Sequence, residues 1–212
     1  MKKNLLALAF LVGLLTCCKS EDAPIKPVKP TDPGSINKEY MSRAETTFAN
    51  IFKYYWSDKV RMMFGSYPNT LGTPQEPSSP DYDSHAYLWG LGSVVSAFNA
   101  IVQNTDNVDF RMTYESRLKE TLLKYYNTTK EPMCFGCFVN PHDQRLYDDA
   151  IWVGIDLADL YSKTKDSWYL DYAKSVWNFV LSGKDDELGG GVYWDENAKD
   201  SKNTCSNAPA VV

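Results

Sequence analysis

The chain has 212 residues, and its 22 Lys and Arg against 27 Asp and Glu give a formal net charge of −5 at pH 7. This mildly acidic balance, without a basic stripe, argues against a nucleic-acid partner. Aromatic residues make up 14% of the sequence. Many of them fill a core, and a surplus also suits stacking on the apolar C–H faces of sugars.

Residues 1–18 are predicted to form a lipoprotein signal peptide. A basic start precedes a mostly apolar run over residues 5–15, which is too short to span a membrane as a helix. The next letters, LTCC over residues 15–18, resemble a bacterial lipobox, in which the new N-terminal cysteine carries lipid. Cys18 is the expected lipidation site and Cys17 the second choice. The alternative is an ordinary signal peptide with incidental cysteines.

Residues 19–36 are expected to be a proline-rich tether. Prolines recur there at near-regular spacing, which predicts an extended, semi-rigid spacer. Glu21 and Asp22, soon after the cysteines, resemble the export signal of surface lipoproteins in Bacteroides-type bacteria. We therefore expect a lipid anchor in a membrane, at the outer membrane or cell surface of a Gram-negative bacterium. Residues 37–212 are enough for one domain with a hydrophobic core.

Three cysteines, Cys134, Cys137 and Cys205, lie in this domain, the first two as a C-x-x-C. A zinc site would need further ligands, and the chain has only His85 and His142. A redox motif would normally follow a strand of a βαβ unit, which the sequence lacks. The pair therefore predicts a local disulfide or two buried thiols, and we expect no metal and no cofactor.

Hydrophobic residues recur at helical spacing almost throughout the domain, which predicts an all-α fold with long loops. Five helices are expected: one from a cap at Ser35 or Asn37 to about residue 56, then about 84–103, from a cap at 106 or 107 to 126, from 143 or 146 to 161, and 167–182. Glycines at 189–191 predict a short extended or hairpin segment, in which they allow positive φ or a close approach of the backbone. The last residues look like the start of a sixth helix, so we expect the sequence to be a fragment or the gene to be truncated.

Two adjacent carboxyls, Asp148 and Asp149, open the fourth predicted helix, which is otherwise mostly apolar or aromatic. A retaining glycosidase needs two carboxyls about 5–5.5 Å apart, one ionised and one protonated. Two close carboxylates repel, so one tends to keep its proton. The alternative is structural, because acids in the first turn of a helix are stabilised by its dipole.

Four stretches carry a resemblance to a known family. They are HAYLWG at 85–90, YDDAIWVG at 147–154, GGGVYW at 189–194 and KNTCSN at 202–207. In this order the chain resembles the N-terminal half of a glycoside hydrolase family 76 domain, the α-1,6-mannanases, over roughly residues 38–212. The resemblance implies that residues 37–212 are a partial catalytic domain, truncated at its C-terminus and forming part of an (α/α)6 barrel.

The resemblance also implies a function, that of a retaining endo-α-1,6-mannanase acting on the polysaccharide backbone of mannan. Asp148 would be the nucleophile and Asp149 the general acid/base. The aromatic and amide candidates for sugar contacts are Tyr87, Trp89, Trp152, Trp194 and Asn207, each of which packing would also explain. The alternatives are a truncated, inactive remnant, a glycan-binding surface lipoprotein on a helical scaffold, or an α/α-barrel glycosidase with another linkage.

Overall fold

The structure is a computed structural model that describes residues 38–68, 85–139 and 144–212. The predicted signal peptide with Cys17 and Cys18, the tether and His142 lie outside the described residues. Within those residues, none of the helices combines the length and the apolar character that crossing a membrane requires.

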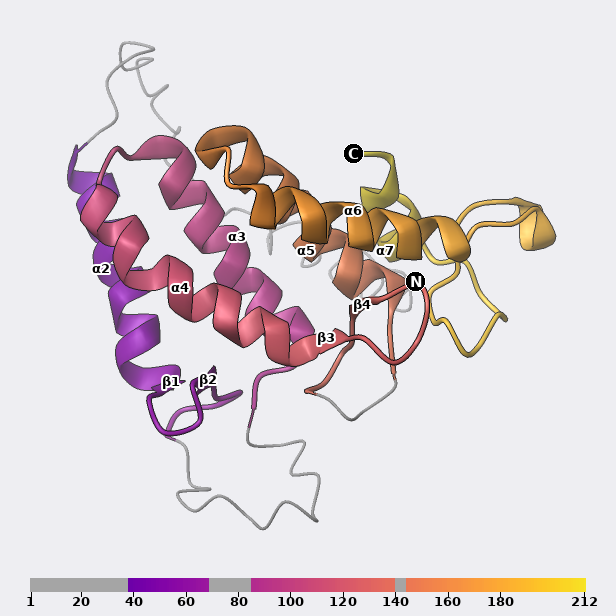
Figure 1. Cartoon of the computed structure of the whole chain (residues 1–212), viewed down its shortest axis with the longest axis horizontal. Helices are drawn as coiled ribbons and strands as arrows, with labels where there is room; N and C mark the ends of the chain where they lie inside the picture. The colour runs from indigo at the N-terminus through magenta and orange to yellow at the C-terminus, as the bar shows by residue number, and fades with distance from the viewer. Residues whose placement is uncertain (1–37, 69–84, 140–143) are drawn as a thin grey trace, which may run out of the picture. The chain divides into compact units, whose positions relative to one another are not determined.

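The described chain is all-α apart from two short strand pairs, as the sequence predicts (Figure 1). The helices are α2 (Lys38–Tyr55), α3 (Leu88–Asn104), α4 (Val108–Tyr125), α5 (Tyr147–Thr164), α6 (Ser167–Ser182) and α7 (Thr204–Asn207). Strand β1 (Trp56–Ser57) pairs antiparallel with β2 (Met62–Met63), and β3 (Tyr126–Asn127) with β4 (Cys134–Phe135). Single 3-10 turns follow at Glu187–Gly189 and Pro209–Val211. Five long helices and a short sixth element agree with the prediction.

Short connections make antiparallel hairpins of α3 with α4 and of α5 with α6 (Figure 1). Asn107 and Asp166 begin the second helix of each hairpin by accepting hydrogen bonds from the backbone N–H of Phe110 (3.1 Å) and Trp168 (3.0 Å). These side chains satisfy N–H groups that have no partner within the helix. The hairpins place the N-terminal ends of α3 and α5 at the same end of the array.

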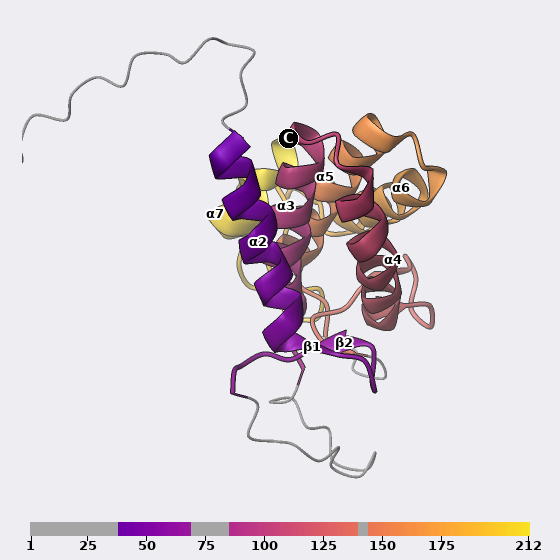
Figure 2. The same cartoon turned by 90° about the vertical axis from the view of Figure 1, so that its left-hand side faces the viewer.

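Helix α3 contacts both α2 and α4, which lie on either side of it in Figure 2. Aromatic rings fill this part of the core, and the Phe48 ring lies 5.3 Å from Phe110 and 6.0 Å from Phe98. Helix α5 packs against α3, α6 and α7 and is therefore the central element of the array. The rings of Tyr147 and Phe179 stack at 4.4 Å where α5 meets α6.

The prediction that the second helix begins near residue 84 is wrong, because α3 begins at Leu88. The backbone before it is extended and is used by other segments. The N–H of Ala86 donates to Met63 O (2.9 Å), and that of Leu88 to Cys137 O (2.9 Å). These tertiary hydrogen bonds replace the first helical turn.

Helix α5 begins at Tyr147 with Leu146 as its N-cap, one of the two predicted starts, and it continues past residue 161 to Thr164. The glycines at 189–191 all have positive φ, as predicted, and Lys184 forms an antiparallel bridge with Val192 across their segment. Of the two alternatives for the C-x-x-C, the structure has two buried free thiols, Cys134 and Cys137.

Candidate active site

The first turn of α5 carries Asp148 and Asp149, whose exposed fractions are only 8% and 9%. The turn is fixed from outside, because the Tyr147 N–H donates to Trp194 O (3.0 Å) and Leu146 forms an antiparallel bridge with Asp195. Buried carboxyls are normally hydrogen-bonded or paired with a cation, since burying a charge without compensation is costly. What surrounds the two carboxyls therefore decides what they can do.

Asp148 is only partly satisfied. Its Oδ2 accepts a hydrogen bond from the Trp194 indole Nε1 (3.3 Å), and the Cys205 thiol of α7 also contacts this carboxyl. Its Oδ1 is buried and has no hydrogen-bond partner among the described residues. Leaving a buried acceptor unpaired costs free energy, so such atoms are rare in folded proteins and call for a specific explanation. Here Trp194 holds one oxygen, and the other is the buried atom without a partner among the described residues.

The environment of Asp149 favours the protonated form of its carboxyl. Burial, followed by repulsion from Asp148, raises its pKa from 3.8 to about 6. A hydrogen bond with the Cys137 thiol acts in the opposite direction and is outweighed. A carboxyl with a raised pKa suits a general acid near neutral pH.

A second set of contacts holds Trp194 beside Asp148. The backbone N–H of Trp194 donates to Ser201 O (3.1 Å). The Lys202 ammonium donates to Asp185 Oδ1 (2.6 Å) and to Glu187 O (2.6 Å). These bonds tie Lys202 to the glycine-containing segment, residues 184–192. These bonds join the two later motifs to the start of α5.

Arg145 also fastens this region. It lies three residues before Asp148 and is fully buried. Its guanidinium forms an ion pair with Glu196 and donates to the backbone oxygens of Lys130 (3.2 Å) and Pro132 (2.7 Å). The same group lies over the Phe179 ring, 4.7 Å from its centroid. Four separate segments therefore meet at one buried charge.

The four aromatic candidates for sugar contacts are all partly exposed, unlike the core rings. The exposed fractions are 46% for Tyr87, 57% for Trp89, 43% for Trp152 and 36% for Trp194. Only Trp194 has a hydrogen bond to the carboxyl pair among the contacts described. Trp152 lies on α5 one turn beyond the pair. These partly exposed side chains are available for contact with a ligand, and aromatic rings can stack on the apolar faces of sugars.

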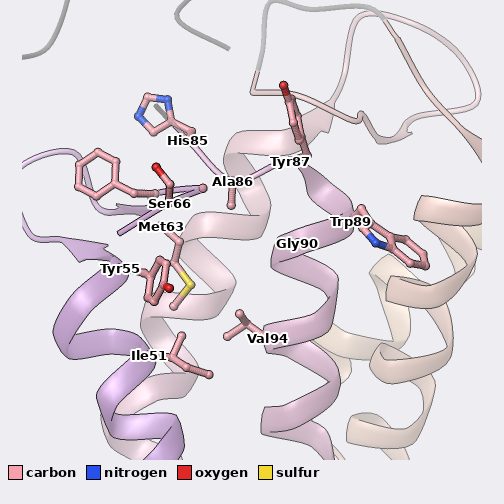
Figure 3. Close-up of a pocket in the computed structure, with 12 residues that line it drawn as sticks. Ile51, Tyr55, Met63, Ser66, His85, Ala86, Tyr87, Trp89, Gly90 and Val94 are labelled. Atoms are coloured by element: carbon pink, nitrogen blue, oxygen red, sulfur yellow. The ribbon is translucent and has the colours of Figure 1, made fainter. Parts of the chain in front are cut away.

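Tyr87 and Trp89 also line a pocket of about 690 Å³ between the end of α2 and the start of α3 (Figure 3). Tyr55 and His85 face it from the side of α2, whereas the Trp89 ring points to the far side of α3 in that view. Asp148 and Asp149 are not among the lining residues. The pocket is thus separate from the carboxyl pair.

Asn207 is engaged by the backbone. Its Oδ1 accepts from Val192 N (2.7 Å), and its Nδ2 donates to Val192 O (2.8 Å) and Asn203 O (2.9 Å). A Cβ added at Gly191 would come within 2.3 Å of Asn207 Oδ1, so this close approach requires the glycine. Its part in sugar binding stays a prediction, and its observed contacts fasten the glycine-containing segment to α7.

Sequence reasoning missed three residues of this region, Cys137, Cys205 and Arg145. The two thiols contact the carboxyls from a loop and from α7, and Arg145 organises the segments beneath them. None of these contacts leaves a local pattern, because the partners are far apart in the chain. The only available signal was that Cys137 and Cys205 lie in or near the quoted motifs.

The fold is thus an array of helical hairpins with two buried carboxyls in the first turn of α5. The chain belongs to glycosyl hydrolase family 76, which it matches over residues 39–212. A search of curated proteins gave no match.

Solved structures of the same family resemble this one. A family 76 glycoside hydrolase from a bovine Bacteroides thetaiotaomicron strain has 28% identity and a TM-score of 0.67, over 80% of this chain and 36% of its own. A family 76 mannosidase from Bacteroides thetaiotaomicron VPI-5482 has 24% identity and a TM-score of 0.66, over 81% of this chain and 46% of its own. Family 76 structures are (α/α)6 barrels, and this chain forms part of one.

A third similar structure is that of an α-1,6-mannanase from Salegentibacter sp. HEL1_6, with 20% identity and a TM-score of 0.56, over 81% of this chain and 42% of its own. It is an inactive variant with two consecutive aspartates changed to alanine, in complex with α-1,6-mannotetrose. The chain thus spans less than half the length of each of these three proteins.

Proposed function

We propose that this chain carries the catalytic pair of a retaining endo-α-1,6-mannanase. The observation that carries the proposal is the unequal carboxyl pair: Asp148 has one buried, unpaired oxygen, and Asp149 has a pKa raised to about 6. The Salegentibacter mannanase, inactive when two consecutive aspartates are changed to alanine, supports the same role for Asp148 and Asp149.

In the first step, the Asp148 carboxylate attacks the anomeric carbon of a mannosyl unit. The bond to the glycosidic oxygen breaks, and Asp149 donates its proton to that oxygen. The hydrogen bond from Trp194 holds Oδ2 of Asp148 and orients this carboxylate for the attack. In the second step Asp149 takes a proton from water, the water oxygen attacks the anomeric carbon, and Asp148 is released.

Exposed rings near these carboxyls supply the sugar contacts in this proposal. Trp152 and Trp194 flank the pair, and Tyr87 and Trp89 lie at the start of α3, at the same end of the array. Ring faces cover the apolar faces of hexoses and exclude water from the reacting bond. Asn207 would contribute through the segment it fastens.

We further propose that lipid on Cys18 anchors the protein in a membrane, at the outer membrane or cell surface. The support is the sequence alone: an apolar run, a lipobox-like LTCC and a proline-rich spacer. A polysaccharide such as mannan cannot enter a cell intact, so an external enzyme suits this substrate.

Proton NMR of α-1,6-mannooligosaccharide hydrolysis tests reaction, linkage and stereochemistry together. We expect the α-anomer of the new reducing end to appear first, followed by mutarotation. A β-anomer appearing first would rule out retention, and cleavage of only α-1,2- or α-1,3-linked oligosaccharides would rule out the linkage. Binding measured by calorimetry without any hydrolysis would favour a glycan-binding protein instead.

A further inference from the structure

The glycine-containing segment needs contacts from outside to hold its shape. Four consecutive residues in it have positive φ, from Leu188 at 54° to Gly191 at 86°. Glycines lose more conformational freedom on folding than other residues do, and a leucine in this region of φ is strained. The segment runs almost directly into Trp194, whose indole Nε1 donates to Asp148 Oδ2 (3.3 Å). The contacts that fix the segment therefore also set where Trp194 lies.

Lys202 supplies several of these contacts. Its side chain is only 5% exposed, and its ammonium donates to Asp185 O (2.9 Å), Asp185 Oδ1 (2.6 Å) and Glu187 O (2.6 Å). An ammonium group has three N–H donors, so all of them are used. A buried cation is tolerated where hydrogen bonds and an opposite charge replace its water, and Asp185 supplies that charge. The first half of the segment is thus tied to Lys202.

The chain that leaves the segment is held by the same residue and its neighbour. The Lys202 ammonium lies over the buried Tyr193 ring, 4.5 Å from its centroid. The carbonyl of Ser201 accepts from the backbone N–H of Trp194 (3.1 Å). Lys202 and Ser201 therefore bind the chain before the glycines and the chain after them, up to the residue that holds Asp148.

We propose that Lys202 is a positioning residue for the nucleophile. By tying the two ends of the glycine-containing segment together, it sets the place of Trp194 and so the orientation of the Asp148 carboxylate. The role in catalysis rests on the proposed function of the carboxyl pair, whereas the contacts themselves do not. A carboxylate that is already oriented needs less reorganisation to reach the anomeric carbon. None of the contacts described for Lys202 is with either acid, so its effect runs through Trp194.

The test compares two changes at position 202 with a matched control. Lys202→Met removes the ammonium and keeps an unbranched side chain. Lys202→Gln is milder, because its amide can still donate but has a shorter reach. The control is Lys199→Met. Lys199 is exposed, and its ammonium lies over the same Tyr193 ring at 5.5 Å, but no hydrogen bond joins it to the segment among the described residues.

The first measurement is the indole N–H signal of Trp194 in a ¹H–¹⁵N NMR spectrum. The signal is assigned by its loss in Trp194→Phe, and Asp148→Ala gives its position when the carboxylate acceptor is missing. In Lys202→Met the signal should move most of the way to that position, because Trp194 no longer keeps its place beside Asp148. Lys202→Gln should shift it in the same direction, and Lys199→Met should leave it as in the parent protein.

The second measurement is the hydrolysis of α-1,6-mannan. In Lys202→Met, kcat should fall about tenfold, the scale of one hydrogen bond to a charged group. The change in KM should be smaller, because the orientation of the attacking group matters in the reaction step rather than in binding. Lys199→Met should keep both constants of the parent protein.

An unchanged Trp194 signal in Lys202→Met would overturn the proposal. So would an equal shift in Lys199→Met, because the charge over Tyr193 would then be the cause. A shifted signal with the kcat of the parent would also contradict it, since the attack would not depend on Trp194. If Lys202→Met does not fold, Lys202→Gln decides by the same signal. If the parent does not hydrolyse mannan, the proposed function fails, and the signal still decides whether Lys202 positions Trp194.

Discussion

Asp148 and Asp149 are neighbours in sequence with different surroundings. Trp194 and Cys205 contact the first, and Cys137 contacts the second. Successive residues of a helix point about 100° apart, so each side chain meets a different wall of the site. In the proposed reaction, this difference makes one of two otherwise identical acids the attacking group and the other the proton donor.

The raised pKa of Asp149 makes the stability of the fold depend on pH. The folded protein binds this proton more tightly than the unfolded chain, with a pKa of about 6 against 3.8. The stabilisation is complete below pH 3.8 and is lost as the pH rises through 6. Asp149→Asn, which has no charge to bury, should therefore unfold with a free energy on the order of 2 kcal/mol higher than the parent at pH 8.

Urea denaturation at pH 8 and at pH 3.5 checks this prediction. The gain should be present at pH 8 and absent at pH 3.5. Asp171→Asn, an exposed change on α6, serves as the control and should have little effect at either pH. An equal gain for Asp149→Asn at both pH values would show that burial of the charge is not its cause.

At the scale of elements, the start of α5 depends on the buried ion pair between Arg145 and Glu196. The Arg145 guanidinium also donates to backbone oxygens in the loop that precedes β4. Glu196 directly follows the bridge between Leu146 and Asp195. The ion pair therefore fixes the two bridged segments, which bring Trp194 to Asp148. This ion pair is a structural requirement of the site rather than part of its chemistry.

Arg145→Met should lower the free energy of unfolding by about 3–5 kcal/mol, because it leaves Glu196 buried without its main partner. The control is Lys130→Met, which removes the other, partly exposed cation that lies 3.0 Å from Glu196. It should cost less than about 1 kcal/mol. Both values come from chemical denaturation. Similar losses in the two variants would mean that burial does not distinguish the two ion pairs.

The helices were predictable from sequence where local signals decide the structure. Asn107 and Asp166 cap α4 and α6 through short-range hydrogen bonds. The spacing of apolar residues indicates which face of each helix is buried. The start of α3 was not predictable, because Ala86 and Leu88 bond to Met63 and Cys137 in other segments. A local pattern cannot report such a competition.

The site divides in the same way. The carboxyl pair was predicted because two adjacent acids form a motif, and Trp194 because it ends another; the structure places them in contact. Cys137 and Arg145 were not found as functional residues. Their contacts depend on burial and on partners in other elements, which only the folded chain brings together.

At the scale of the whole molecule, the described chain forms part of an (α/α)6 barrel. The chain spans 36–46% of the length of three similar family 76 proteins. It contains α5, whose first turn carries both acids, and α7, which Asn207 fastens to the glycine-containing segment. The proposed reaction can therefore be tested on this chain directly.

The proposed anchor is tested by cell fractionation. Cys18→Ser should move the protein from the membrane fraction to the soluble fraction and abolish labelling with a palmitate analogue, because the acyl chains supply the membrane affinity. Cys17→Ser should leave both unchanged. The reverse pattern would assign the lipid to Cys17, and no change in either variant would exclude lipidation at both cysteines.

The release of reducing ends from α-1,6-mannan by the parent and by Asp148→Asn tests the central claim most directly. We expect the parent to hydrolyse the polysaccharide and Asp148→Asn to be slower by about 10⁴-fold or more, since an amide cannot form the glycosyl–enzyme bond. Asp171→Asn on α6 should keep the parent rate. Equal rates for the parent and Asp148→Asn, or no hydrolysis by the parent, would contradict the assignment.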